Sequence, residues 1–277
     1  MQRADQYAVF GHPIIQSQSP TIHTWFAIQT NQNLTYVAQD VDREHFAHHL
    51  RGFMKGGGKG INCTIPLKEM AYSIADSLSP RAEQCKAVNT LSFNEHGQIH
   101  GDNTDGAGFI RDLTRNLNIH ITDKHVLILG AGGATRGIVT PILEEIPASL
   151  TIANRTPNKA LELSIEFGTD APVIGCGFDE LEGQTYDLII NATSTSLTGE
   201  VPRIPANIIG QNACCYDLAY DKSKPTSFVE WACKSGAAIS VDGIGMLIEQ
   251  AAEAFFIWRG IRPETAQIIK KLKQGRT

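Results

Sequence analysis

A glycine-rich segment that follows an apolar run directly is the feature that most restricts the fold of this chain. The segment GAGGATRG covers residues 130–137 and comes after the run HVLIL at residues 125–129. A buried strand that turns through glycines into a helix directs backbone amides and the positive end of the helix dipole at one point, where a dinucleotide pyrophosphate can bind. The residues expected to face the pyrophosphate are Gly130, Ala131, Gly132, Gly133 and Ala134.

The end of the next apolar run indicates which dinucleotide binds. The run LTIA at residues 150–153 is followed by Asn154, Arg155 and Thr156. An NAD site usually offers Asp or Glu here to the ribose hydroxyl, whereas an amide and a guanidinium suit a ribose phosphate. The sequence therefore predicts NADP as the cofactor. The alternatives are that Arg155 is a surface ion-pair partner and that the glycine motif arose by chance.

Length, composition and charge favour a two-domain cytoplasmic enzyme. A chain of 277 residues suffices for two cores, and its 42% hydrophobic content contains no apolar stretch near the roughly 20 residues that span a bilayer. A formal charge of −5 argues against a nucleic-acid surface. The six cysteines contain no CxxC pair, which favours reduced thiols. We find no signal-peptide pattern at the N-terminus and expect a cytoplasmic monomer or homodimer.

The order of apolar runs predicts an α/β protein with two α/β lobes. We expect a first domain over 1–104, with C-terminal helices of about 245–277 packing back on it, and a second over 105–244. In the second domain, runs at 186–191, 213–218 and 237–241 alternate with helices, as in a Rossmann-like doubly wound parallel sheet. In the first, we predict strands at 7–11, 34–40 and 60–64, helices from Ser19 and over 43–54, and a hairpin that turns at 94–97.

A series of polar motifs resembles a known family. GHPIIQSQSPTIH, NCTIPLKE, AVNTL, GDNTDG, GAGGATRG, NRT, NATS, YDLAY and DGIGMLIEQAA occur in the order and spacing of bacterial shikimate dehydrogenases, across residues 7–262. The resemblance implies an NADP-dependent oxidoreductase that reversibly reduces 3-dehydroshikimate to shikimate, in the pathway to chorismate and the aromatic amino acids. Its small-molecule partner would be shikimate or 3-dehydroshikimate.

The resemblance also implies roles for individual residues. Lys68 and Asp105 match the family's catalytic pair, with Lys68 as general acid or base beside the reacting oxygen. The residues that match substrate-binding positions are Ser17, Ser19, Thr64, Asn89, Tyr220 and Gln250. The residues that match cofactor-binding positions, besides the glycine loop, are Asn154, Arg155, Thr156, Lys159, Thr193, Leu218 and Gly243.

Most of these residues also have an ordinary structural interpretation. Ser19 and Asp105 could cap helices, with Pro20 in the first helical position, and Lys68 could be a solvated lysine. Asn89 could satisfy a sheet edge, and Gln250 lies on a mostly apolar helical face where an amide needs a partner. The histidines at 45, 48 and 49 have helical spacing but lack HExxH, so solvated side chains are favoured over a metal site.

The chain departs from the family pattern at Gln16, Cys63 and Ser196, where histidine, valine and glycine are common. The Ser196 change affects the loop expected near the nicotinamide, because glycine and serine differ in their access to positive φ. Pro225 also lies farther from Tyr220 than in the common YxPxxT pattern. There are three other candidate functions. Residues 154–156 argue against the first, an NAD-dependent quinate/shikimate dehydrogenase, and the SxS and NTDG elements do not suit the pterin of the second, a methylenetetrahydrofolate dehydrogenase. The third is a non-catalytic NADP-sensing regulator. The paired Lys68 and Asp105 favour an enzyme over the regulator.

Overall fold

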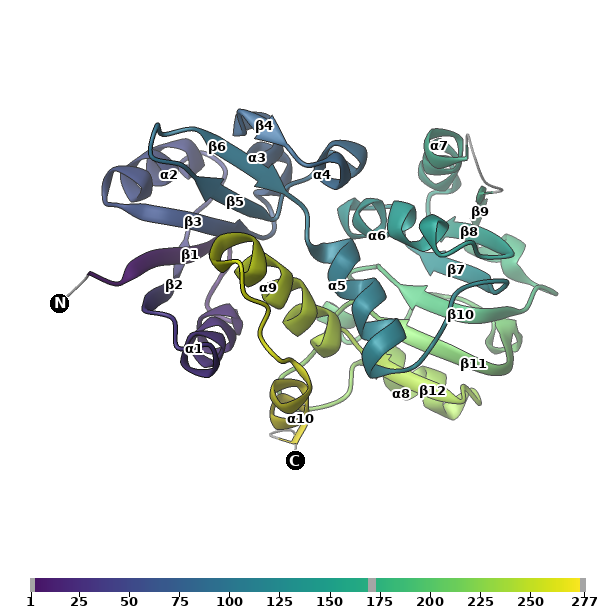
Figure 1. Ribbon diagram of the computed structural model, residues 1–277. Helices are drawn as coiled ribbons and strands as arrows, with labels where there is room; N and C mark the ends of the chain where they lie inside the picture. The colour runs from purple at the N-terminus through teal and green to yellow at the C-terminus, as the bar shows by residue number, and fades with distance from the viewer. Residues whose placement is uncertain (1–2, 169–172, 275–277) are drawn as a thin grey trace. The chain divides into compact units, whose positions relative to one another are not determined.

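The computed structural model describes residues 3–168 and 173–274, and within them each of two units contains one six-stranded sheet (Figure 1). The first unit comprises residues up to Gly108 together with Ile248–Ile268, and the second comprises Phe109–Leu247 and the chain from Ile269. The chain therefore passes from one unit to the other within three helices, α5 (Asp105–Arg111), α9 (Ile244–Arg259) and α10 (Ala266–Gln274).

The sheet of the first unit is mixed and has the strand order β2-β1-β3-β5-β6-β4. Its strands β2, β1 and β3 are parallel, whereas β3, β5 and β6 pair antiparallel. The strands are β1 (Asp5–Gly11), β2 (Leu34–Asp40), β3 (Gly58–Cys63), β4 (Ser77–Leu78), β5 (Thr90–Phe93) and β6 (Ile99–Asp102). The helices are α1 (Ser19–Gln29), α2 (Phe46–Lys55), α3 (Lys68–Ile74), α4 (Pro80–Cys85) and most of α9.

Alternate residues of β1 are buried on opposite faces of this sheet. Ala8 and Phe10 lie in one apolar cluster with residues of α2, α3 and α4, whereas Tyr7 and Val9 lie in another with Tyr36 and Trp258. In a strand, successive side chains point to opposite faces, so the continuous apolar run YAVF covers both. Helices therefore cover both faces, with α2 and α3 on one and α1 on the other (Figure 1).

The sheet of the second unit is entirely parallel in its described pairs and has the order β12-β11-β10-β7-β8-β9. The strands are β7 (His125–Leu129), β8 (Ser149–Asn154), β9 (Val173–Gly177), β10 (Tyr186–Asn191), β11 (Ile209–Asp217) and β12 (Ile239–Asp242). Among the helices are α6 (Gly133–Glu144), α7 (Pro157–Phe167), α8 (Ser227–Lys234) and α10 (Ala266–Gln274). The unit also contains a short π-helix, η1 (Asp112–Asn116), and three 3-10 helices, η2 (Phe178–Leu181), η3 (Thr195–Thr198) and η4 (Ala206–Ile208).

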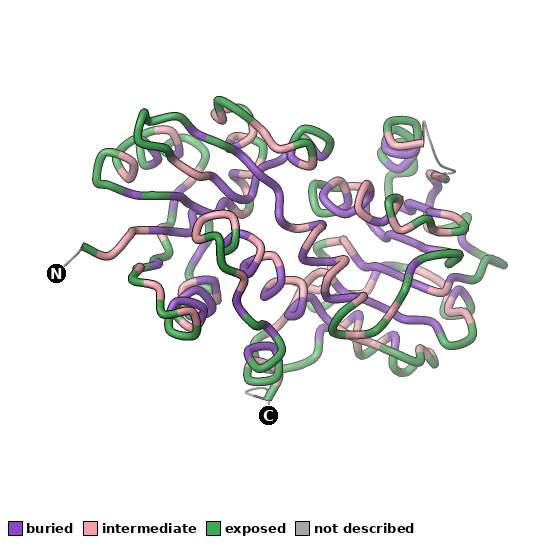
Figure 2. Tube along the Cα trace, viewed as in Figure 1, coloured by how far each residue is buried: buried purple, intermediate pink, exposed green. Residues whose placement is uncertain are grey.

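This strand order confirms the predicted Rossmann-like doubly wound sheet. Counted from β7, the order is that of a dinucleotide-binding domain, and the connections reverse direction between β7 and β10. Its strands are largely buried, as Figure 2 shows. Ligands of such sheets bind beyond the carboxyl ends of the strands at the point of reversal. For β7 and β10, those ends are Leu129 and Asn191.

The start of α1 differs from the prediction. Ser19 is the first helical residue rather than the N-cap, and Pro20 is the second. The capping position belongs to Gln18, whose side chain makes no capping hydrogen bond, while the Ser19 amide donates to Oγ of Ser17 over 3.3 Å. The expected helix over 43–54 also begins later, at Phe46.

Candidate active site

The ammonium of Lys68 and the carboxylate of Asp105 form an ion pair, with 2.5 Å between Nζ and Oδ2. Lys68 is the first residue of α3 and Asp105 the first of α5, so two helix starts bring together residues far apart in the sequence. The backbone of Lys68 is held by a hydrogen bond from the Val88 amide to its carbonyl. The two side chains are 29% and 15% exposed, so solvent, and a ligand, can reach them.

The side chain of Asn89 fixes the other oxygen of Asp105. The Thr104 amide donates to Oδ1 of Asn89 over 2.9 Å, and because an amide N–H only donates, Nδ2 must occupy the opposite side. That Nδ2 donates to Oδ1 of Asp105 over 2.9 Å. Asp105 thus has one oxygen on Lys68 and the other on Asn89, which sets the plane of its carboxylate.

Asp105 is the first residue of its helix rather than the N-cap, and its own amide bonds another side chain. Its amide donates to Oδ1 of Asn103 over 3.0 Å, and Nδ2 of Asn103 donates to the Ala87 carbonyl over 2.9 Å. Asn103 is buried and was not among the predicted site residues. The available signal was its position two residues before the helix start, because Asn side chains commonly accept from the backbone amide two residues on.

A buried polar network extends from Asn89 across the sheet of the first unit. Asn62 in β3 donates to the Asn89 carbonyl and to Oγ1 of Thr90, both over 3.0 Å, and accepts from the Tyr36 hydroxyl over 2.7 Å. Sequence reasoning did not single out Asn62, Thr90 or Tyr36. A single amide within an apolar strand was the available signal, since buried polar groups require partners.

The remaining predicted residues of the first unit differ in their burial and contacts. Oε1 of Gln250 lies 3.4 Å from both Nδ2 of Asn89 and Oγ1 of Thr104, so Gln250 belongs to the same group of side chains. Ser17 is half-buried and Ser19 is buried. Thr64 is half-buried between β3 and α3, and its amide bonds the Phe10 carbonyl over 2.9 Å.

In the second unit, the glycine loop lies at the end of β7, as predicted. Gly130 has φ +105°, and a Cβ there would come within 3.2 Å of Ala192 and Thr193, so only glycine fits. A Cβ on Gly132 or Gly133 would meet no atom within 4 Å, so these residues border open space at the start of α6. Oγ1 of Thr135 holds the loop by donating to the Gly130 carbonyl over 2.7 Å.

The residues after β8 offer an exposed cationic surface. Arg155, Thr156 and Lys159 are exposed, and Arg155 makes no ion pair within the part of the chain that the structure describes. Asn154 differs, because Nδ2 donates to the Thr156 carbonyl over 3.0 Å. One of its two N–H groups therefore stabilises the turn into α7, and its carbonyl oxygen remains for a ligand.

The last predicted residues follow the strands β10 and β11. The Thr193 hydroxyl donates to Oδ1 of Asn191 over 2.6 Å, and the Leu218 amide donates to the Asn191 carbonyl over 2.9 Å. A Cβ on Gly243 would collide with the Leu218 carbonyl, so glycine is required there. Tyr220, predicted to contact substrate, is half-buried in the second unit.

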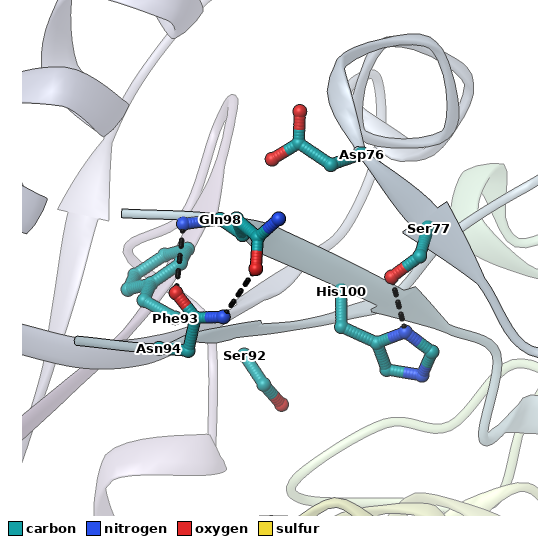
Figure 3. Close-up of a pocket in the computed structure, with 7 residues that line it drawn as sticks. All are labelled: Asp76, Ser77, Ser92, Phe93, Asn94, Gln98 and His100. Carbon is teal, nitrogen blue, oxygen red and sulfur yellow. Dashed lines mark hydrogen bonds between the residues drawn. The ribbon is translucent and has the colours of Figure 1, made fainter. Parts of the chain in front are cut away.

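A separate cavity of about 220 Å³ lies beside the β5–β6 hairpin and β4 (Figure 3). Asn94 bonds Gln98 over 2.7 Å, and Ser77 bonds His100 over 2.9 Å, so these groups satisfy one another. None of the predicted site residues lines this cavity. The residues that line it are Asp76, Ser77, Ser92, Phe93, Asn94, Gln98 and His100.

The structure assigns no metal to the histidines near α2. His45, His48 and His49 are exposed, and His45 bonds the carboxylate of Asp42 over 2.8 Å. Over residues 3–168 and 173–274, no three His, Cys, Asp or Glu side chains form a group suited to a metal ion. Over the same residues, no helix has the length and apolar character needed to cross a membrane.

Comparison with known proteins places this geometry in a family. Residues 9–91 match the shikimate dehydrogenase substrate binding domain, 112–200 the shikimate / quinate 5-dehydrogenase family, and 243–273 the shikimate 5'-dehydrogenase C-terminal domain. The chain is 55% identical to the shikimate dehydrogenase (NADP(+)) of Methylococcus capsulatus, with 100% of this chain and 99% of that protein covered. The chain belongs to the shikimate dehydrogenase family. The resemblance inferred from the sequence motifs is thereby confirmed.

Solved structures of similar proteins agree with this assignment. An Ael1 enzyme from Pseudomonas putida matches with a TM-score of 0.91 and 44% identity, over 97% of this chain and 98% of that one. A shikimate 5-dehydrogenase from Thermus thermophilus, solved in complex with NADP(H) and shikimate, matches with a TM-score of 0.85 and 30% identity over 98% and 99% of the chains. The fold of both units is thus that of shikimate dehydrogenases.

Proposed function

We propose that this chain is an NADP-dependent shikimate dehydrogenase, which reversibly reduces 3-dehydroshikimate to shikimate in the cytoplasm. The observation that carries the proposal is the ion pair of Lys68 and Asp105, joined by 2.5 Å in a chain 55% identical to a curated enzyme of that name. We assign substrate binding to the first unit and NADP binding to the second. The enzyme acts as a monomer or a homodimer.

The residues at the end of β7 fit the cofactor. Gly132 and Gly133 border open space where a side chain would otherwise project, and the following helix α6 is long enough to orient its dipole at a pyrophosphate. The exposed Arg155 and Lys159 supply positive charge for a ribose phosphate, which favours NADP over NAD. NADPH, when bound, supplies the hydride that reduces the ketone.

The proton required by the reaction comes from Lys68. Reduction of a ring ketone adds a hydride to carbon and a proton to oxygen, and the Lys68 ammonium supplies that proton or stabilises the developing alkoxide. Asp105 keeps the ammonium in place, and in the oxidation direction the uncharged amine takes the proton back. Asn89 donates to the second carboxylate oxygen of Asp105. The role of Asn89 in this proposal is therefore to position Asp105.

The substrate carries a carboxylate and several hydroxyls, and the first unit presents polar groups for both. We assign the carboxylate to Ser17 and Ser19, and ring hydroxyls to Thr64 and Gln250. A site of this kind discriminates because its buried polar groups are left unpaired by an analogue that lacks a hydroxyl. Each hydrogen bond contributes on the order of 1 kcal/mol to binding, so selectivity depends on all of these hydrogen bonds together.

The test follows absorbance of the reduced cofactor with purified protein and each pair of substrate and cofactor. We expect turnover with NADP and shikimate, much less with NAD, and none without a substrate. Faster turnover with quinate and NAD would instead indicate a quinate/shikimate dehydrogenase. Binding of NADP without turnover of either substrate would indicate a regulator and refute the proposal.

A further inference from the structure

A fully buried carboxylate at the end of β11 is held by neutral groups. Asp217 is 0% exposed, and its described hydrogen bonds all come from uncharged donors. The shortest are from the hydroxyls of Ser196 and Thr226, both over 2.6 Å to Oδ2. Burial raises the pKa of Asp217, and these hydrogen bonds oppose the rise. A buried carboxylate is tolerated only when such donors satisfy it, so each donor is held firmly.

The proton of Ser196 has a defined position. The Thr193 amide donates to Oδ1 of Asn191 over 3.2 Å, and because it only donates, Nδ2 of Asn191 must face the other way. That Nδ2 approaches Oδ1 of Asp217 over 3.1 Å and Oγ of Ser196 over 3.2 Å. The Ser196 oxygen therefore accepts from Asn191, and its proton goes to the carboxylate.

Ser196 belongs to a short loop that abuts the glycine loop. The loop comprises Thr193 and the turn η3 (Thr195–Thr198), and it follows β10 at the point where the sheet reverses its winding. The methyl of Thr193 would lie only 3.2 Å from a Cβ on Gly130. The position of this loop thus limits the space directly beside the first glycine of the predicted pyrophosphate site.

We propose that Ser196 is a positioning residue for NADP binding, which holds the loop of Thr193 and η3 against Asp217 and so preserves the space at Gly130. This inference rests on the proposed function, since it assumes that the glycine loop binds NADP. Ser196 touches no cofactor atom in the proposal and acts through the loop. This role also explains how the chain accommodates serine where glycine is common in the family. Ser196 is not among the described residues with positive φ, and its hydroxyl has two hydrogen-bond partners.

The chain offers a matched control for this role. Thr226 donates to the same oxygen of Asp217 over the same 2.6 Å, but it comes from the N-cap of α8 rather than from the loop. Ser196→Ala and Thr226→Ala therefore remove equivalent hydrogen bonds from one carboxylate. Both are expected to lower the melting temperature, whereas only the first releases the loop.

The experiment titrates NADPH into wild type, Ser196→Ala, Ser196→Thr and Thr226→Ala without substrate, and measures Kd by the change in cofactor fluorescence. We expect Ser196→Ala to raise Kd about five- to tenfold, while Ser196→Thr and Thr226→Ala stay within about twofold of wild type. Thermal unfolding of each variant establishes that it is folded at the titration temperature.

The other outcomes separate the inference from the proposed function. Wild-type protein that fails to bind NADPH would overturn the assigned cofactor, and the inference with it. Wild-type binding with an unchanged Kd in Ser196→Ala would overturn the inference alone. An equal rise in Ser196→Ala and Thr226→Ala would also overturn it, because the effect would then come from the buried carboxylate and not from the loop.

Discussion

Nδ2 of Asn89 donates a hydrogen bond of 2.9 Å to the oxygen of Asp105 that faces away from Lys68. The relationship matters because a carboxylate held at one oxygen can still rotate, whereas one held at both cannot. The amide of Asn89 is itself fixed by the Thr104 amide, so the orientation of the ion pair derives from the backbone. We therefore treat Asn89 as part of the catalytic arrangement rather than as a simple contact for a ring hydroxyl.

Asn89→Ala is expected to lower kcat for shikimate oxidation by about ten- to a hundredfold, because Asp105 loses one of its two fixed partners. It is also expected to lower the free energy of unfolding by about 1 to 3 kcal/mol, since the buried Thr104 amide loses its acceptor. Steady-state kinetics and urea unfolding measure the two effects. Asn94→Ala, at an exposed hairpin turn, serves as the control, and equal kcat values in the two variants would contradict this role.

Arg155→Ala is expected to reduce the preference for NADP over NAD by about tenfold or more, because an exposed guanidinium is the residue best placed to pair with a ribose phosphate. The change should appear as a higher KM for NADP and an unchanged KM for NAD, measured at saturating shikimate. Arg203→Ala changes another exposed arginine of the same unit and should leave both values unchanged. A preserved NADP preference in Arg155→Ala would assign the phosphate to other residues.

His23 is expected to make stability depend on pH. It lies in α1, stacks on Tyr36 with ring centroids 4.1 Å apart, and has no described hydrogen-bond partner at either ring nitrogen. Burial lowers the pKa of His23 from 6.5 to about 3. Below pH 6.5, His23 is therefore protonated in the unfolded chain but stays neutral in the folded chain. Its contribution to stability is present above pH 6.5 and is lost as the pH falls toward 3.

The predicted loss from His23 is about 2 kcal/mol between roughly pH 7 and pH 5. Urea unfolding at several pH values should show this decline in wild type and a shallower one in His23→Phe, which keeps an aromatic ring but cannot be protonated. His96→Gln, at an exposed turn, should follow wild type. If the free energy of unfolding varied with pH in the same way in wild type and His23→Phe, the His23 ring would be protonated equally in the folded and unfolded chain.

The sequence predicted the elements and the pairing of Lys68 with Asp105 better than it predicted the groups that hold this pair. Short continuous apolar runs located β1 and β10, because a strand that is buried on both faces is apolar along its length. The partners of Asn62 could not be predicted in this way, since they lie in other strands or directly before one, 26 to 28 residues away. Such pairings depend on sheet order and register, which local patterns do not specify.

Ser19 and Ser196 illustrate the same limit at single residues. The Ser-Pro pair predicted an N-cap at Ser19, but the helix begins one residue earlier than that pattern implies and Ser17 bonds the first amide. For Ser196, the sequence pointed to the backbone conformation as the property that differs from glycine. The structure shows instead that its side chain forms hydrogen bonds with Asp217 and Asn191. Neither outcome follows from residue type alone, because each depends on a neighbour supplied by the fold.

The most direct test of the catalytic assignment is single-turnover reduction of 3-dehydroshikimate by NADPH in Lys68→Ala, beside wild type and Lys59→Ala, an exposed lysine of β3. Because the proposed role of Lys68 is to supply the proton, its loss should lower the rate by about two to four decades while the Kd for NADPH stays within about twofold. Lys59→Ala should match wild type. A Lys68→Ala enzyme that reduced the ketone at a rate near wild type would contradict the account, since the ion pair with Asp105 would then have no part in the reaction.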